Sequence, residues 1–335
     1  MTKLDVMIPT LNEEARLGNC LASIFSQRFP KNVELSIYVI DAGSVDKTVV
    51  IAEMAGVKVL DNSALKDPEA AKMIGLNAAR GEFFLFMDAD MACAEDDTLW
   101  RLLQPLIEDE TLAGAFGRYA PMRGDVGLNR ALSMNPMQCD PFYQAFLPRL
   151  PEDSGILEFD SAGINIPPIA GTCMFRTELV RKSVPYVERY FDVDTPVHLS
   201  RNGHSRFFYA ENARFFHGHI ASFGQLARKR LRNLDNGRGN GLFTTQRVSR
   251  VYRWIAIERF GLFRTALRAA GALSGVALLP GAVIQMVRHR DMAALLEPLL
   301  GIVVGWSVLW GTLRSRSGRS FIASMVWRSG TFGGS

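Results

Sequence analysis

The sequence predicts an α/β domain with a largely parallel central sheet, followed by an α-helical region that associates with a membrane. Three observations support this prediction. Over the first ninety residues, short apolar runs alternate with helical patterns, as in a parallel sheet with crossover helices. Residues 83–87 are continuously apolar, as expected for a strand buried on both faces. Of the 335 residues 48% are hydrophobic, and the excess lies mostly after residue 250.

The elements of the α/β domain follow from the apolar periodicity. Strands are expected at 6–10, 35–40, 57–60 and 83–87, with helices between them at about 12–25, 47–54 and 69–79. Asn12 is expected to cap the first helix, where Glu13 and Glu14 would favour the helix dipole. Further strands are expected at 112–117, 171–176 and 207–210, and a basic helix at 225–232. The proline-rich region 111–170 has little regular patterning, which indicates functional or mobile loops.

The charge distribution suggests an anionic partner. The net charge is only +4, but the first 110 residues are acidic and the segment 201–268 is dense in arginine. A nucleotide diphosphate or lipid headgroups would fit, whereas no nucleic-acid-binding motif accompanies the charge, so we predict no nucleic acid partner. The four cysteines form no C-x-x-C pair and indicate reduced thiols in the cytoplasm. The N-terminus carries a charge within a short apolar run, which predicts a strand rather than a signal peptide.

Two carboxylates follow the apolar strand at 83–87. Asp88 and Asp90 are one residue apart, so on an extended segment their side chains point to the same side. They would repel each other unless a cation lay between them, and such oxygen ligands suit Mg²⁺ or Mn²⁺. An Asp-x-Asp sequence is common in exposed loops, but open α/β sheets bind ligands at the carboxyl ends of their strands. The sequence therefore predicts a metal site here.

Three motifs, taken in order, give a more specific prediction. They are Ile8-Pro-Thr-Leu-Asn-Glu-Glu14, Asp41-Ala-Gly-Ser-Val-Asp-Lys-Thr48 and Ala79-Arg-Gly-Glu-Phe-Phe-Leu-Phe-Met-Asp-Ala-Asp90. Their order and spacing resemble the family-2 glycosyltransferases with the GT-A fold, over roughly residues 4–235. The resemblance implies a Rossmann-like domain that binds a nucleotide sugar together with Mn²⁺ or Mg²⁺.

The resemblance also implies where the nucleotide sugar binds. The implied nucleotide-binding residues are Pro9, Thr10, Asn12, Glu13, Asp41, Lys72, Asp88 and Arg228. The family often carries Arg-Asn where this chain has Lys72-Met73, and a lysine meets a phosphate only as a point charge. Two alternatives stay open from the sequence: Glu13 as a partner of the helix dipole, and Lys72 on a solvated helix face.

Two further implied roles lie in the second half of the domain. Asp194 matches the aspartate of the family's Glu-Asp pair, with Val193 in place of the glutamate, so Asp194 is the first candidate for the general base and Asp192 the second. Either aspartate would otherwise serve as a helix N-cap. His217, beside a cluster of arginines, is expected near the diphosphate and the metal. Gln225-Leu-Ala-Arg228 is followed by lysine and not by the tryptophan of processive members, which favours the addition of a single sugar.

The C-terminal third predicts membrane association. Arginines alternate with aromatic residues at 247–268, as in an interfacial helix on an anionic bilayer. Two apolar stretches follow, 269–287 and 292–313, each interrupted by proline, and they form either two spans or a re-entrant hairpin. Arginines after residue 313 favour a cytoplasmic C-terminus. We therefore expect a catalytic domain at 1–240 and a membrane region at 241–335, on the cytoplasmic side of the cell's inner membrane.

Together these observations predict an inverting glycosyltransferase. It would transfer one sugar from a nucleoside diphosphate sugar, UDP-sugar being favoured, to a membrane-embedded acceptor such as a lipid-linked saccharide or another glycolipid. One alternative is a polyprenyl-phosphate sugar synthase, whose anionic acceptor would need no general base. Another is a catalytically idle membrane scaffold that retains the fold for binding. The sequence does not predict an oligomeric state.

Overall fold

The structure is a computed structural model that describes residues 1–135, 140–147, 149–161, 166–185, 187–218, 220–234, 257–316, 318–320 and 322–323. The chain forms two compact units that interleave along the sequence. We call Met1–Ala120, Pro151–Gly163 and Pro168–Gly218 the sheet unit. We call Pro121–Leu150, Ile164–Pro167 and His219–Ser335 the helical unit. The predicted domain boundary at residue 240 lies outside the described residues and stays a prediction.

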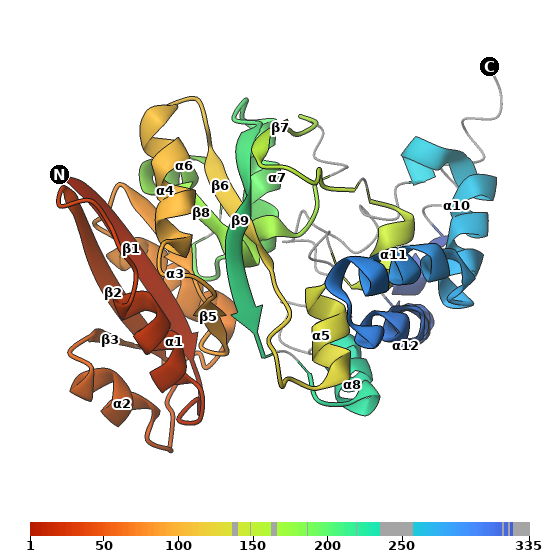
Figure 1. The fold of residues 1–335 in the computed structure, drawn as a ribbon, viewed down its shortest axis with the longest axis horizontal. Coiled ribbons are helices and arrows are strands. Elements are labelled where there is room, and N and C mark those ends of the chain that lie inside the picture. The colour runs from red at the N-terminus through yellow and green to blue at the C-terminus, as the bar shows by residue number, and fades with distance from the viewer. Residues whose placement is uncertain are drawn as a thin grey trace. The chain divides into compact units, whose positions relative to one another are not determined.

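The sheet unit contains one mixed sheet (Figure 1). Its described strands are β1 (Thr2–Thr10), β2 (Val33–Asp41), β3 (Lys58–Asp61), β4 (Phe83–Phe86), β5 (Met91–Cys93), β6 (Gly114–Tyr119), β7 (Gly155–Glu158), β8 (Cys173–Arg176) and β9 (Arg206–His217). Their order is β3-β2-β1-β4-β8-β6-β9-β5, with β7 paired to β9. The first four strands are parallel, as predicted, and β8 joins β4 antiparallel. The predicted α/β fold is confirmed.

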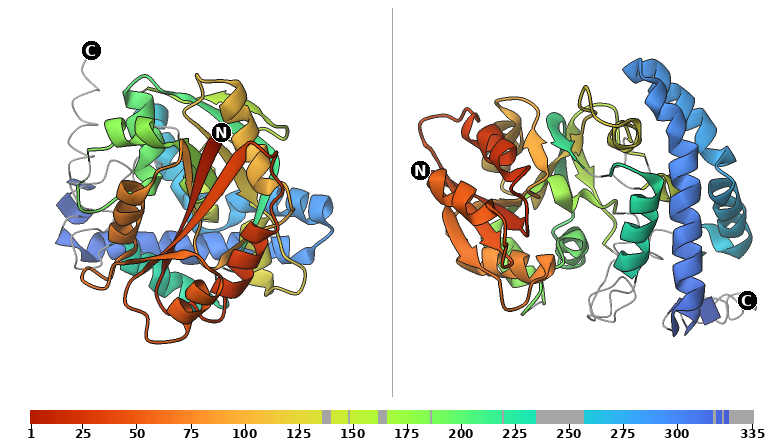
Figure 2. Two further views of the ribbon diagram at one scale, coloured as in Figure 1. Left: turned by 90° about the vertical axis from the view of Figure 1, so that its left-hand side faces the viewer. Right: turned by 90° about the horizontal axis from the view of Figure 1, so that it is seen from below.

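Helices cover both faces of this sheet (Figure 2). They are α1 (Leu17–Phe25), α2 (Thr48–Met54), α3 (Pro68–Ala78), α4 (Thr98–Glu108), α6 (Thr177–Ser183) and α7 (Thr195–Arg201). On one face, α1 and α4 pack with alternate residues of β1 into the main core. On the other face, α3 approaches closely at Gly75, where an added Cβ would lie 2.8 Å from the sulfur of Met7. As predicted, β4 is buried along its whole length.

The structure corrects the predicted start of the first helix. Asn12 does not cap a helix, because α1 begins at Leu17 and Asn12 takes a positive φ of 58°. The Asn12 side chain instead accepts a hydrogen bond from the backbone N–H of Val45 at 2.9 Å, in the loop after β2. The predicted strand at 207–210 is the first part of the longer strand β9. Three of the four cysteines are described, and these are free and buried, as expected for reduced thiols.

The helical unit holds the apolar C-terminal stretches. Its described elements are α5 (Gly127–Ser133), η1 (Pro141–Ala145), α8 (Phe223–Leu234), α10 (Ile257–Leu273), η4 (Val276–Leu278), α11 (Leu279–His289), η5 (Met292–Leu296) and α12 (Glu297–Arg314). The stretch 269–287 is not one continuous helix, because Gly275 takes a φ of 75° and the chain bends there by 85°. Met292–Arg314 is long and apolar enough to cross a membrane, a test that core helices of soluble proteins also pass. Residues 247–256 of the predicted interfacial helix at 247–268 lie outside the described residues, and the rest of that segment forms the first part of α10.

Candidate active site

The candidate site lies where the parallel strands end. Thr10 and Asp41 are the last residues of β1 and β2, and they pair in register. The Asp41 carboxylate is almost fully buried and accepts hydrogen bonds from the backbone N–H groups of Gly43 and Ser44, both at 2.9 Å. The Thr10 hydroxyl lies 3.3 Å from the other carboxylate oxygen of Asp41. Asp41 therefore fixes the turn that follows its own strand.

The loop after β1 is joined to the loop after β2. The backbone N–H of Asn12 donates to the Ser44 hydroxyl at 2.8 Å, and that of Glu13 donates to Thr48 Oγ1 at 2.7 Å. Burial raises the pKa of Glu13, Arg16 opposes this, and the carboxylates of Asp90 and Asp88 raise the pKa further. Glu13 therefore belongs to the electrostatic surroundings of Asp88 and Asp90. It precedes α1, so it does not lie in the first turn of that helix.

Asp88 and Asp90 meet His217 in a three-residue group. His217 ends β9 and pairs with Met91 of β5, the short strand directly after Asp90. One ligand atom from each of the three side chains lies within 4.8 Å of the others, and His217 Nε2 is 3.3 Å from Asp90 Oδ1. Carboxylates favour Mg²⁺ and Mn²⁺, and imidazole is a common ligand of divalent transition metals. The donor set therefore fits the metal predicted from the sequence.

Tyr119 belongs to the same region, and the sequence reasoning missed it. Its ring stacks on the His217 imidazole with a centroid separation of 4.9 Å. Burial raises the pKa of Tyr119, and the carboxylates of Asp88, Asp90 and Asp192 add to that increase. Strand β6 continues two residues past its predicted end at Gly117, and this extension brings Tyr119 beside β9. Had the strand predicted at 112–117 been extended by two residues, it would have placed Tyr119 at the edge of the sheet near His217.

Lys72 and Asp192 form an ion pair that joins α3 to the segment before α7. The Lys72 Nζ lies 2.6 Å from Asp192 Oδ2, and each side chain is only 13% exposed. Burial lowers the pKa of Lys72, but the nearby carboxylates of Asp192 and Asp88 raise it by more. Lys72 therefore does not lie on a solvated helix face. Asp194, two residues on, is completely buried.

The remaining predicted residues are placed as follows. Pro9 lies within β1, opposite Ile40 of β2. Arg228 lies on α8 in the helical unit, so its contact with a nucleotide stays a prediction. The described residues thus bring together Asp88, Asp90 and His217, with Glu13 and Lys72 in electrostatic reach of the carboxylates.

Comparison with known proteins identifies the family. Residues 5–183, more than half of the chain, match Glycosyl transferase family 2. The chain belongs to this family. The predicted glycosyltransferase class and the GT-A fold are thereby confirmed.

Individual relatives are more distant. The chain is 37% identical over 95 residues to the poly(ribitol-phosphate) β-N-acetylglucosaminyltransferase TarS of Staphylococcus aureus, which covers 27% of this chain and 16% of TarS. It is 35% identical over 106 residues to a dolichyl N-acetyl-α-D-glucosaminyl phosphate 3-β-D-2,3-diacetamido-2,3-dideoxy-β-D-glucuronosyltransferase of Methanococcus voltae. This match covers 30% of this chain and 32% of that protein. The chain therefore spans less than a third of either relative.

A solved structure shows the same fold over most of the chain. The mannosyltransferase PcManGT of Pyrobaculum calidifontis, solved with GDP-Man and Mn²⁺, superimposes with a TM-score of 0.51. The superposition covers 92% of this chain and 87% of PcManGT, at 15% sequence identity. At that identity the likeness extends to the fold alone.

Proposed function

We propose that this glycosyltransferase moves a single sugar, with inversion, from a nucleoside diphosphate sugar to a hydroxyl group of a lipid-linked saccharide. The observation that supports it most is the group of Asp88, Asp90 and His217 at the carboxyl ends of the parallel strands. Open α/β sheets bind their ligands at this edge. UDP-sugar is the favoured donor, from the resemblance seen in the sequence.

In this proposal the metal and the nucleotide share the strand edge. Asp90, Asp88 and His217 would hold Mn²⁺ or Mg²⁺, and the ion, when bound, neutralises charge on the leaving diphosphate. The base and ribose would lie against the two joined loops that contain Pro9, Thr10, Asn12, Glu13 and Asp41. The hydrogen bonds between these loops would hold both loops in place before the donor binds.

We propose Asp192, rather than Asp194, as the general base. A sugar hydroxyl is hardly ionised at neutral pH and needs a proton acceptor within hydrogen-bond reach. Asp192 keeps some exposure and contributes to the electrostatic environment of Tyr119, as Asp88 and Asp90 do. Asp194 is completely buried, which favours a structural role. The Lys72 ammonium beside Asp192 would orient its carboxylate.

Two observations support a lipid-linked acceptor. The Methanococcus voltae relative is named for a dolichyl phosphate-linked substrate. The helical unit contains an apolar helix of membrane-spanning length, consistent with a location at the inner membrane. The lysine after Arg228 supports the addition of one sugar, since the tryptophan of processive enzymes is absent from the sequence.

Metal-dependent donor binding is the direct test. The full-length protein is incubated with a panel of nucleoside diphosphate sugars, with and without Mn²⁺, and its thermal unfolding and donor hydrolysis are measured. A donor at about one hundred times its Kd should stabilise the fold by about 2.7 kcal/mol. Asp90→Asn should remove the metal-dependent part, whereas Asp96→Asn, at an acid that pairs with Arg28 and does not belong to the three-residue group, should not. Equal metal-dependent stabilisation of both variants would refute the site.

A further inference from the structure

We propose that the helical unit binds the surface of an anionic bilayer through one apolar face of α10, α11 and α12, and that these helices lie in the membrane plane rather than crossing it. We call this surface the membrane face. It deepens the membrane association of the proposed function by giving that association a geometry. It depends on the helical unit alone, and the metal group plays no part in it.

Helix α12 has one exposed face and one buried face. Leu299, Trp306, Trp310 and Leu313 are each about half exposed, at 48%, 55%, 60% and 48%. Their spacing of seven, four and three residues places them along one side of the helix. The intervening positions Leu300, Val304 and Val308 are buried against the rest of the unit. A single helix that crosses the bilayer would be in contact with lipid on all sides. Helix α12 has only one side that lipid could contact.

The buried face of α12 packs too closely to be a loose attachment. A Cβ added at Gly305 would lie 2.7 Å from the Phe142 ring of η1 and 2.8 Å from Leu273 of α10. A Cβ added at Gly311 would lie 2.5 Å from Leu234 of α8. Small residues thus allow three other elements to contact α12 along its length. Moving α12 into a membrane would therefore move these elements with it.

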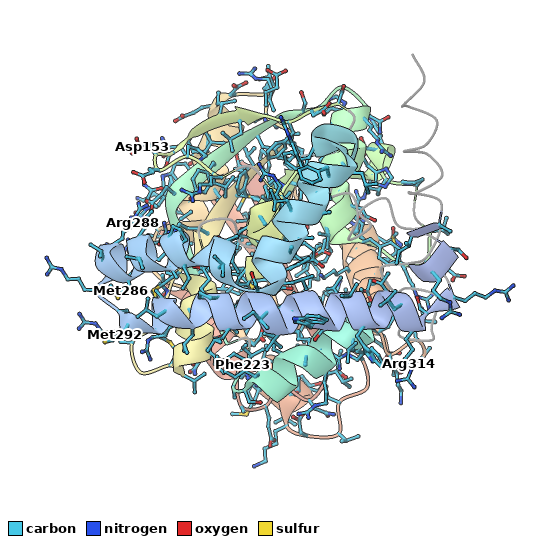
Figure 3. All side chains as sticks on the ribbon, turned by 90° about the vertical axis from the view of Figure 1, so that its right-hand side faces the viewer. Asp153, Phe223, Met286, Arg288, Met292 and Arg314 are labelled. Carbon is cyan, nitrogen blue, oxygen red and sulfur yellow. The ribbon has the colours of Figure 1, made fainter. Side chains whose placement is uncertain are left out.

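The charges on α8 exclude a crossing in this arrangement. Figure 3 shows α8, which begins at Phe223, lying across α12, and the two helices pack against each other. Helix α8 carries Arg228, Lys229 and Arg232, in addition to Arg230, which is paired with Asp140. If α12 crossed the bilayer, these cations would enter the hydrocarbon region, where lysine and arginine are costly. If α12 lies in the plane, α8 stays on the aqueous side.

Helices α10 and α11 add exposed apolar side chains beside α12. In Figure 3 they form one layer with α12, nearest to the viewer, with α8 behind that layer. Phe263 and Leu267 of α10 are 80% and 65% exposed, and Val287 of α11 is 68% exposed. Large apolar side chains gathered on three adjacent helices exceed the scattered exposure that is normal for a soluble surface.

The charges around the membrane face match anionic headgroups. Residues 260–316 contain six arginines and only two acids, Asp291 and Glu297. Asp291 is paired with Arg130 at 2.7 Å, and Glu297 is buried and bonded to Gln144. Arg288 and Arg314 lie near opposite ends of the helix layer (Figure 3). Apolar side chains bordered by cations fit an anionic lipid surface, while a second copy of the chain would bring arginines against arginines.

Depth measurements separate a helix in the plane from a crossing helix. Spin labels are attached to Leu299→Cys, Trp306→Cys and Leu313→Cys, in a Cys139→Ser background, because the other native cysteines are buried. The full-length variants are bound to phosphatidylcholine vesicles with about one quarter phosphatidylglycerol. The outer two positions are about 21 Å apart along the helix axis. We expect similar, shallow depths of about 5–10 Å at all three. A central label much deeper than the outer two would show a crossing helix and overturn the proposal.

A partition assay tests the surface without labels. Trp306→Ala combined with Trp310→Ala should lower partitioning onto the same vesicles by about tenfold or more, because two large apolar side chains are lost. Phe25→Ala, at a phenylalanine of the sheet unit that is 54% exposed, is the matched control and should change nothing. Unchanged partitioning of the double variant would overturn the proposal, and so would labels that all stay outside the bilayer, whether exposed to water or covered by a second copy of the chain. Metal-dependent donor binding should be the same in the wild type and in every variant, and its absence from all of them would count against the proposed function instead.

Discussion

The carboxylate of Asp192 is the most informative target in the sheet unit. Asp192→Asn keeps the size of the side chain but removes its negative charge and its capacity to accept a proton as a base. If Asp192 takes the proton from the acceptor hydroxyl, the rate of transfer should fall about a hundredfold to ten-thousandfold, with donor binding nearly unchanged. A fall in the rate alone would identify a group needed for the chemical step.

The substitution also has a structural cost that must be separated from the catalytic one. Lys72 and Asp192 are 2.6 Å apart and each is 13% exposed, so Asp192→Asn leaves a mostly buried ammonium without its carboxylate. Breaking a buried pair costs about 3–5 kcal/mol, and the residual exposure places this pair at or below the lower end. The double variant Asp192→Asn/Lys72→Met removes the unpaired charge and should recover much of the lost stability. It should not recover the rate.

The assay is transfer to a lipid-linked saccharide under saturating donor, with unfolding by denaturant measured on the same preparations. Asp194→Asn is the matched control, because it makes the same chemical change two residues away at a completely buried position. We expect it to lower stability with little effect on the rate per folded molecule. Near-normal transfer by Asp192→Asn would refute the base assignment. The role of base would then return to Asp194, whereas a wild-type protein that transfers sugar to a lipid phosphate and not to the saccharide would favour an acceptor that is already anionic and needs no base.

Three further predictions concern the site and its support. Gly171→Ala should weaken metal-dependent donor binding and lower stability by about 1–3 kcal/mol, because the new Cβ would lie 2.7 Å from the Tyr119 hydroxyl. Gly155→Ala is the control, because a Cβ added there would have no other atom within 4 Å. Equal effects of the two substitutions would refute this reasoning. Burial lowers the pKa of Lys72 but carboxylates raise it by more, to above the ordinary 10.5. The stabilisation that the ion pair gives is therefore complete below about pH 10.5 and lost at higher pH. The difference in unfolding free energy between wild type and Lys72→Met should shrink as the pH rises above that value, and a constant difference would contradict the pairing. Finally, a chain that ends at residue 240 should aggregate, as judged by size-exclusion chromatography.

The parts of the site that can be predicted without the family resemblance are those encoded within one short segment. An apolar run followed by Asp88 and Asp90 contains both the buried strand and the ligands, so local sequence suffices to place the acids at the strand edge. The parallel order of the first four strands follows in the same way from the alternation of strands and helices. These features depend on neighbours in the sequence and on backbone geometry alone.

The parts that were missed depend on contacts between distant segments. Lys72 meets Asp192 across 120 residues, and no local pattern distinguishes a buried lysine of this kind from a solvated one. Tyr119 reaches His217 only because β6 pairs with β9 in a particular register. Asn12 resembles a helix cap in sequence, but its side chain accepts a hydrogen bond from Val45 in the loop after β2, and the helix begins only at Leu17. Hydropathy likewise cannot tell a helix surrounded by lipid from one packed on protein.

The expected failure of the chain that ends at residue 240 follows from how the helical unit is assembled. The segment Pro121–Leu150 belongs to that unit, together with everything after residue 218. Without α12, the ring of Phe142, now 4% exposed, would lose the Gly305 surface on which it packs. Arg130 would also lose its partner Asp291.

Burial of one such ring contributes about 1.5–3 kcal/mol, a large share of ordinary domain stability. The middle segment would therefore present apolar surface to water and aggregate. A chain that ends after residue 323 keeps these contacts and should behave as the full-length protein does. A monodisperse 1–240 chain that binds donor with full affinity would show that the middle segment folds without α10, α11 and α12.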